Sequence, residues 1–216
     1  HNCLVGSEMC IRDRKDAGIT DFHAVPSLAG AMKAVNAGVD GLVVEGTEGG
    51  GFKASEEVGL QVLIQSIKKK TDLPIVAAGG IVDGVGMAAA FAAGAEGIQM
   101  GTRFVSSLES PVHQNFKNKI LDSNEEGTYI LNKKGKPCIR AMKSNLTEEI
   151  YEKGIMDMSA LGNIKDLYFE GDMEAAPALA GQSMGLIDKV KPVKEIIDET
   201  IQQFNLVCDA MQQAKL

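Results

Sequence analysis

The chain has 216 residues, of which 44% are hydrophobic and 24% are charged, as in ordinary folded soluble proteins. A formal net charge of −7 argues against a nucleic-acid or anionic-membrane partner. The longest uncharged apolar stretch, residues 87–95, is far shorter than the roughly 20 residues of a membrane span. The four cysteines are too widely spaced for a zinc site, so we expect reduced thiols and a cytoplasmic location.

The first residues do not read as a targeting signal. Residues 1–14 have neither an apolar core nor a small-residue cleavage site, and they look like translated sequencing-adaptor sequence. We therefore expect a non-native or disordered leader over residues 1–14 and native sequence from Lys15. On that interpretation the chain is a fragment; the alternative is a natural disordered leader.

From Gly18 onward, short apolar runs alternate with helical patterns, which is typical of parallel βαβ units. The predicted strands cover residues 19–25, 39–44, 74–78 and 97–100. Helices are expected from Ser27 to Asn36, from Ser55 to Lys70 and from Asp83 to Ala93, and a glycine-rich loop covers residues 46–51. A repeat between residues 34–41 and 90–97, each a helix end followed by glycine and a strand, supports four βα units over residues 15–110.

Residues 111–216 form a less regular, mainly helical C-terminal extension of the same domain. Helices are predicted at residues 113–123, from Thr147 to about Met158, and at residues 193–211, with short strands at 128–131 and 138–142. Apolar residues at helical spacing in the last helix indicate a packing face.

Two glycine turns follow consecutive predicted strands. Residues 77–81 read Ala-Ala-Gly-Gly-Ile, and residues 99–103 read Gln-Met-Gly-Thr-Arg. In a (β/α)8 barrel the loops after the last two strands commonly bind phosphate through backbone N–H groups. Either turn alone could serve only chain reversal, but the pair at successive strand ends favours a phosphate site.

Three motifs carry a family resemblance. Residues 45–51 (EGTEGGG), 75–84 (IVAAGGIVDG) and 96–104 (EGIQMGTRF) occur in this order with compatible spacing. The region from Gly18 to Ile201 resembles the nitronate monooxygenase (2-nitropropane dioxygenase-like) family, which includes flavin-dependent enoyl-acyl-carrier-protein reductases. The resemblance implies an α/β fold that is the C-terminal half, strands five to eight, of an FMN-binding TIM barrel.

The same resemblance implies which residues contact FMN. Phosphate and ribityl contacts would come from the two glycine turns, and the flavin would be lined from the loop after the second predicted strand. The implied cofactor-binding residues are Glu45, Gly50, Gly79, Gly80, Gln99, Met100, Gly101 and Thr102. Gly181 and Gln182 resemble a further family segment near the cofactor.

One position departs from the family pattern. Family members often carry Gly-Gly-His where this chain has Gly50, Gly51 and Phe52. Because phenylalanine cannot exchange a proton, the catalytic residue stays unassigned. His23, on the first predicted strand, is a candidate acid or base; packing is the alternative role for it.

The resemblance favours an FMN-dependent oxidoreductase that oxidises alkyl nitronates with dioxygen. An NAD(P)H-dependent reductase of a quinone or enoyl thioester is the first alternative, and a non-catalytic phosphate-ligand-binding fragment is the second. A barrel similar to inosine-monophosphate dehydrogenase is disfavoured because residues 45–53 contain no cysteine nucleophile. We expect a small-molecule substrate and no metal, and we consider self-association as a homo-oligomer.

Overall fold

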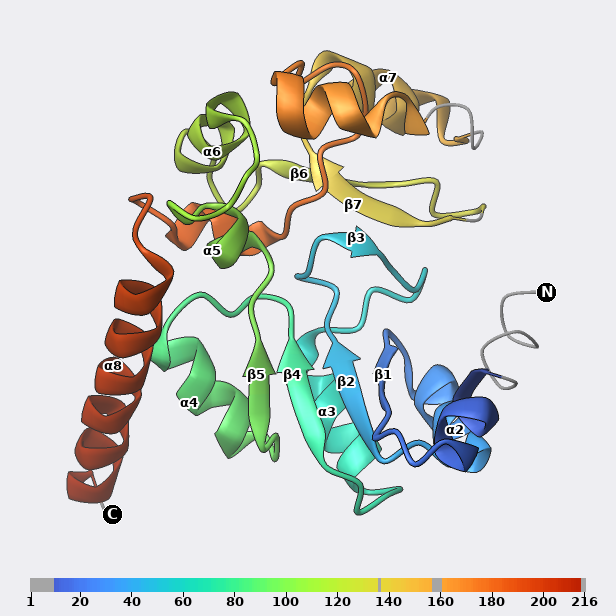
Figure 1. The fold of residues 1–216 in the computed structure, drawn as a ribbon, viewed down its shortest axis with the longest axis vertical. Helices are drawn as coiled ribbons and strands as arrows, with labels where there is room; N and C mark the ends of the chain where they lie inside the picture. The colour runs from blue at the N-terminus through green and yellow to red at the C-terminus, as the bar shows by residue number, and fades with distance from the viewer. Residues whose placement is uncertain (1–9, 136, 157–160, 215–216) are drawn as a thin grey trace.

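The computed structural model describes residues 10–135, 137–156 and 161–214, and its lower part in Figure 1 is a parallel sheet. Across the sheet the strands are β1 (Phe22–Val25), β2 (Gly41–Glu45), β4 (Ile75–Ala78) and β5 (Gly97–Gln99). The helices that alternate with them are α2 (Leu28–Ala37), α3 (Leu60–Lys68) and α4 (Gly84–Ala92). This confirms the predicted parallel α/β alternation, with strand ends that differ by a few residues.

The core of this layer lies between the sheet and its helices. Leu42 and Val44 of β2 and Ile75 and Ala77 of β4 are completely buried in one apolar cluster with residues of α2 and α3. Because side chains alternate along a strand, the residues between them point to the opposite face of the sheet. On that face, at the edge strand β1, Phe22 is 43% exposed.

Two of the predicted helix starts are confirmed. The hydroxyl of Ser27 accepts a hydrogen bond from the Gly30 N–H at 3.1 Å, and the carboxylate of Asp83 accepts one from the Gly86 N–H at 2.9 Å. Such caps satisfy N–H groups that have no partner inside the helix.

The predicted start of α3 was wrong. Residues 55–59 are not helical, and α3 begins at Leu60. The carboxylate of Glu48, in the loop after β2, accepts the Leu60 N–H with both oxygens at 3.1 Å. The capping group thus comes from 12 residues earlier in the chain, which a local capping pattern around Ser55 does not reveal.

A second, antiparallel sheet lies above the first in Figure 1. Its order is β3 (Gly51–Phe52), β7 (Ile139–Met142) and β6 (Thr128–Leu131), and it is accompanied by α6 (Gln114–Leu121) and α7 (Asn145–Lys153). Both predicted strands of the extension are confirmed. The short strand β3 was not predicted, because its pairing partner lies far along the chain.

The start of α7 also differs from the prediction. Ser144 is its N-cap, and Thr147 is the third residue of a reciprocal capping box in which the Ser144 N–H donates to the Thr147 hydroxyl at 2.8 Å. The helix ends at Lys153, where Gly154 adopts the left-handed conformation with φ 70°, and residues 157–160 lie outside the described part.

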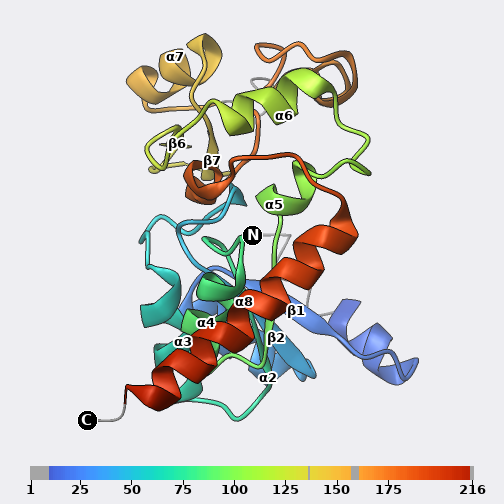
Figure 2. The same cartoon turned by 90° about the vertical axis from the view of Figure 1, so that its left-hand side faces the viewer.

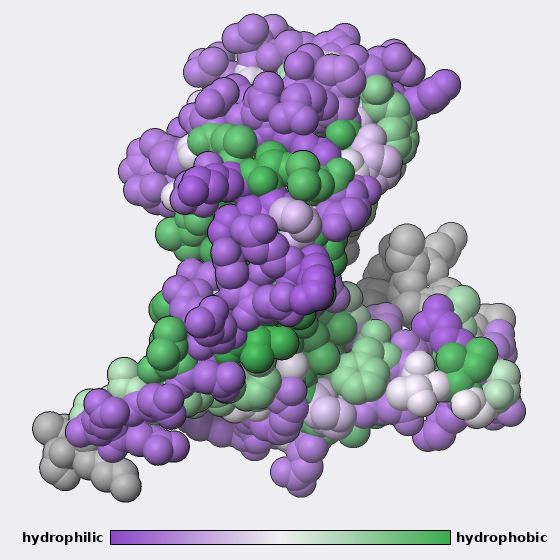
Figure 3. Space-filling view, turned by 60° about the vertical axis from the view of Figure 1, so that its left-hand side comes forward, coloured by the Kyte–Doolittle hydropathy of each residue, from purple (hydrophilic) through white to green (hydrophobic). Residues whose placement is uncertain are grey.

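The C-terminal segment returns to the first layer. After α5 (Thr102–Val105), η2 (Asp166–Glu170) and η3 (Gln182–Leu186), the long helix α8 (Val193–Gln213) runs beside α4 (Figure 2). A Cβ at Gly84 would collide with the backbone of Thr200 and Phe204, so this glycine permits the close approach of the two helices. The predicted packing face of α8 is confirmed in part: Ile196 and Thr200 are buried, whereas Ile197 and Ile201 are 42% and 51% exposed. In the view of Figure 3, hydrophilic side chains cover most of the upper layer, and hydrophobic patches lie within that layer and on the lower one.

The expected leader falls only partly within the described residues. Residues 1–9 lie outside them, whereas residues 10–16 are helical, with Ile11 buried and Arg14 paired with Asp21 at 2.9 Å. Residues 10–14 therefore form part of a helix, and the expected leader and the domain boundaries stay a prediction. Of the cysteines, Cys10, Cys138 and Cys208 carry free thiols, and Cys3 lies outside the described part.

No helix in the described ranges is long and apolar enough to cross a membrane.

Candidate functional site

A cavity of about 210 Å³ opens at the carboxyl ends of β2, β4 and β5. The strand register pairs Glu45 with Ala78 and Ala78 with Gln99, so these three residues form one row across the sheet. Ligands of parallel α/β sheets commonly bind beyond the carboxyl ends of the strands. The cavity is lined by Glu45, Gly49, Gly50, Gly51, Ala78, Gly79, Gly80, Ile81, Gln99, Gly101, Thr102, Val105, Leu179, Ala180 and Ser183.

The glycines of the two predicted turns shape this cavity in different ways. Gly79 and Gly80 adopt φ values of 93° and 75°, which side chains other than glycine rarely tolerate. A Cβ at Gly79 would also lie 2.9 Å from the Gly49 nitrogen. Gly101 has an ordinary φ of −95°, and a Cβ there would meet no atom within 4 Å. Gly101 therefore borders open space, whereas Gly79 lies where the loop after β4 packs closely against the loop after β2.

A buried arginine holds the glycine-rich loop after β2. Arg140, on β7, donates from Nε to the Thr47 carbonyl at 2.8 Å and from Nη1 to the Thr128 hydroxyl at 2.7 Å. It is 6% exposed. Sequence reasoning missed Arg140, because nothing near it in the sequence indicates a partner 93 residues away.

The segment around Ala180 covers the cavity from above. The Gly181 N–H donates to the Thr102 hydroxyl at 3.0 Å, and the Gln182 N–H donates to the Glu48 carbonyl at 2.9 Å. A Cβ at Gly50 would lie 2.5 Å from the Ala180 carbonyl carbon. The predicted segment Gly181–Gln182 therefore ties together the loops after β2 and β5. Leu179, Ala180 and Ser183, which line the cavity itself, were not predicted.

The structure brings most of the predicted cofactor-binding residues together in this cavity. The seven that line it are Glu45, Gly50, Gly79, Gly80, Gln99, Gly101 and Thr102. Met100 does not line it and instead packs against the core beneath the helices. The contacts of these residues with a cofactor stay a prediction.

Phe52, at the position of the family histidine, and His23, the candidate acid or base, both lie outside this cavity. Phe52 is 65% exposed and borders a neighbouring cavity together with Lys133 and Cys138. His23 pairs with Leu42, whose side chain is buried beneath the helices, and does not line the pocket at the strand ends.

Glu45 is paired with a buried lysine. Lys53 Nζ lies 2.6 Å from Glu45 Oε1, and the exposed fractions of the two side chains are 1% and 27%. Burial lowers the pKa of the Lys53 amine, although the hydrogen bond and charge of Glu45 act to raise it.

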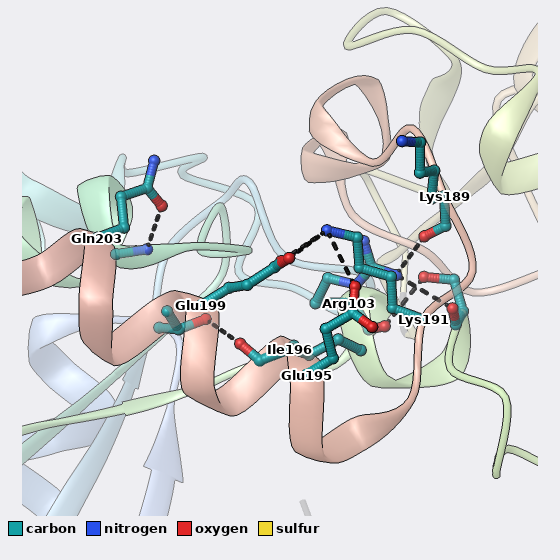
Figure 4. A network of polar contacts seen from close by, with 10 residues as sticks. Arg103, Lys189, Lys191, Glu195, Ile196, Glu199 and Gln203 are labelled. Carbon is teal, nitrogen blue, oxygen red and sulfur yellow. Dashed lines mark hydrogen bonds and ion pairs between the residues drawn. The ribbon is translucent and has the colours of Figure 1, made fainter.

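Arg103, on the short helix α5 that follows β5, points toward the chain that precedes α8 (Figure 4) and does not line the cavity. Its Nη2 donates to the carbonyls of Lys189 at 2.6 Å and Ser106 at 3.1 Å, and the residue is 6% exposed. Arg103 thus fixes the turn that carries Gly101 and Thr102.

A glycine-lined pocket at the carboxyl ends of parallel strands defines an α/β protein with a cavity where ligands of such sheets commonly bind. A sequence profile described as nitronate monooxygenase matches residues 4–203, so the chain belongs to the nitronate monooxygenase family.

Individual relatives agree with this assignment. A probable nitronate monooxygenase from Staphylococcus aureus strain MSSA476 is 30% identical over 94% of this chain, and a second, from strain MRSA252, is 29% identical. The chain spans 61% of the length of each of these curated relatives. Among solved structures, FabK from Thermotoga maritima has a TM-score of 0.90 and 36% identity, covering 96% of this chain and 68% of FabK.

A more distant structure shows the same fold. Nitroalkane oxidase from Streptomyces ansochromogenes has a TM-score of 0.82 at 23% identity, covering 94% of this chain and 62% of that protein.

Proposed function

We propose that this chain provides the FMN site of a flavin-dependent oxidoreductase that oxidises alkyl nitronates with dioxygen. The observation that carries the proposal is the cavity in which seven of the eight predicted cofactor-binding residues meet. Membership of the nitronate monooxygenase family and the relatives of that name support it. A small-molecule substrate and a cytoplasmic location belong to the same proposal.

The residues present fit a flavin phosphate. Gly101 borders space that a side chain would otherwise occupy, so a phosphate could approach its backbone N–H directly. The Thr102 hydroxyl already accepts the Gly181 N–H, which leaves its own proton free to donate to a ligand oxygen. Gln99 and Ser183 add further polar groups to the wall.

The chemistry divides between the cofactor and the chain. A bound flavin would supply the redox step between substrate and dioxygen. The described residues would hold the phosphate at Gly79, Gly80 and Gly101, and the 179–183 segment would exclude water from above.

The alternative of a barrel similar to inosine-monophosphate dehydrogenase, which needs a cysteine nucleophile, gains no support from the structure. Cys138 is the cysteine beside the Lys53 backbone, whose N–H donates to the Cys138 carbonyl at 2.9 Å. Burial raises the pKa of the Cys138 thiol, which keeps it protonated at neutral pH and unsuited to nucleophilic attack.

A stopped-flow experiment tests the reaction class. The FMN-loaded protein is mixed anaerobically either with an alkyl nitronate or with NAD(P)H, and bleaching of the visible flavin band is followed. The proposal predicts bleaching by the nitronate and recovery of the band when dioxygen is admitted. Bleaching by NAD(P)H alone would instead support the reductase alternative, and failure to bind FMN would contradict flavin chemistry in this chain.

A further inference from the structure

Glu45 is the single ionisable side chain among the described residues that line the proposed flavin pocket. The remaining wall consists of glycines, aliphatic residues and the uncharged polar groups of Gln99, Thr102 and Ser183. Phe52, where the family pattern expects histidine, borders a different cavity. Glu45 is therefore the described lining residue whose side chain is best suited to act as a general base.

The ion pair between Glu45 and Lys53 is built into the fold. Besides its contact of 2.6 Å with Glu45, Lys53 Nζ lies 3.5 Å from the Gly46 carbonyl. Gly49 covers the pair, because a Cβ there would lie 2.5 Å from Glu45 Oε1 and 2.8 Å from Lys53 Nζ. Burying an amine is costly unless an opposite charge accompanies it, so Lys53 depends on Glu45 as its partner.

The other charges that act on Lys53 have their own partners. Glu48, in the same loop, caps α3 through the Leu60 N–H, and Arg140, on β7, is bonded to Thr47. Glu45 is the third charged side chain that acts on Lys53, and it is the one in direct contact with the Lys53 amine. Glu45 is therefore the carboxylate that accompanies the buried Lys53 amine, and Lys53 holds the Glu45 carboxylate in place through this contact.

We propose that Glu45 is the catalytic base of this pocket and that Lys53 is the positioning residue that keeps Glu45 ionised and fixed in direction. The inference rests on the proposed function. A Glu45 oxygen takes a proton from a substrate carbon next to an electron-withdrawing group. The C–H bond breaks, an O–H bond forms, and the electron pair stays on the substrate; the proton passes to solvent at the end of turnover.

This assignment predicts which forms of the substrate the site can use. A pocket with its own base can accept a neutral nitroalkane, which must lose a proton, as well as the preformed nitronate anion. Replacing Glu45 with glutamine should therefore reduce turnover of the neutral form by about 100-fold or more, while turnover of the nitronate falls much less.

The test follows the ionisation of Glu45 directly, by the ¹³C resonance of its carboxyl group as a function of pH, in the apoprotein and with FMN bound. Glu45→Gln assigns the resonance by removing it. Lys53→Met should change this titration, because it removes the positive charge that lies 2.6 Å from the Glu45 carboxylate. Lys53→Arg retains the positive charge and should stay close to wild type.

Lys133→Met is the matched control, because Lys133 forms a half-exposed pair with Glu57 at 2.8 Å and does not line the flavin pocket. It should leave the Glu45 titration and turnover unchanged. Gly49→Ala, which inserts a methyl group against the ion pair, should act in the same direction as Lys53→Met.

Two results would overturn the inference alone: FMN binds normally and Lys53→Met leaves the Glu45 titration unchanged, or Glu45→Gln slows the neutral nitroalkane and the nitronate equally. A wild-type chain that binds no FMN would overturn the proposed function and this inference together. Thermal melting of each variant separates these results from misfolding.

Discussion

Gly101 offers a substitution that separates cofactor binding from folding. A methyl group at Gly101 enters open space and the backbone is unstrained, so Gly101→Ala should leave the thermal melting temperature of the apoprotein unchanged. The same methyl group would occupy the space proposed for phosphate. We predict that FMN affinity falls about tenfold or more, equivalent to about 1.4 kcal/mol, as measured by fluorescence titration.

Gly30→Ala serves as the control, because Gly30 lies on α2 away from the cavity and alanine is compatible with a helix. Unchanged FMN affinity in Gly101→Ala would show that the phosphate does not bind beside this residue. Gly50→Ala forms a useful contrast, since its Cβ would press on the Ala180 backbone and should lower both stability and affinity.

At the scale of elements, the contact between α4 and α8 depends on Gly84. Its N–H donates to the Gln203 side chain at 2.9 Å, and a Cβ would collide with the backbone of α8. Gly84→Ala should therefore destabilise the fold by about 1–3 kcal/mol, as overpacking commonly does. Chemical denaturation measures this loss. A stability equal to wild type would contradict the packing of α8 against α4.

Glu96 ties together three elements of the sheet layer. Its carboxylate accepts from Lys68 at 2.6 Å, at the end of α3, and from the Ile75 N–H at 2.7 Å, at the start of β4. Partial burial would raise its pKa, but these two hydrogen bonds outweigh burial and lower the pKa below the ordinary 4.5. The resulting stability is present above pH 4.5 and is lost as pH falls through the lowered value.

Glu96→Gln should consequently lower the free energy of unfolding by about 0.5–1 kcal/mol near neutral pH, a loss kept small by solvent screening. At a pH below the lowered pKa of Glu96 the substitution should change stability little. Urea unfolding at several pH values measures the difference. Glu149→Gln, which breaks an exposed pair with Lys153, is the control. A cost independent of pH would show that the carboxylate charge is not the source of the stability.

The elements show which features local sequence can predict. The four parallel strands and the caps at Ser27 and Asp83 depend on periodicity and on contacts three residues apart, so they were predicted to within a few residues. The start of α3 depends on Glu48, and the shape of the pocket depends on Arg140 and Ala180, which lie far away in sequence. The glycines of the pocket could be predicted because their motifs are local, whereas the Lys53–Glu45 pair was found only in three dimensions.

At the scale of the whole molecule, the face of the sheet opposite the helices is incompletely covered. Phe22 on the edge strand β1 is 43% exposed, and Ile19 just before it is 55% exposed. Exposed apolar side chains beside an unpaired strand edge favour association. We predict that the isolated chain self-associates in size-exclusion chromatography and that Phe22→Ser reduces this association. A monomer at all concentrations would contradict the prediction.

Binding of FMN at the carboxyl ends of β2, β4 and β5 is tested most directly by mapping FMN onto the backbone amides of the chain. In ¹H–¹⁵N spectra recorded during an FMN titration, we predict saturable shifts at Gly50, Gly79, Gly80, Gly101 and Thr102 that are absent at Lys133 and Gly135 of the neighbouring cavity. Shifts confined to that neighbouring cavity, or no shifts at saturating FMN, would contradict the account.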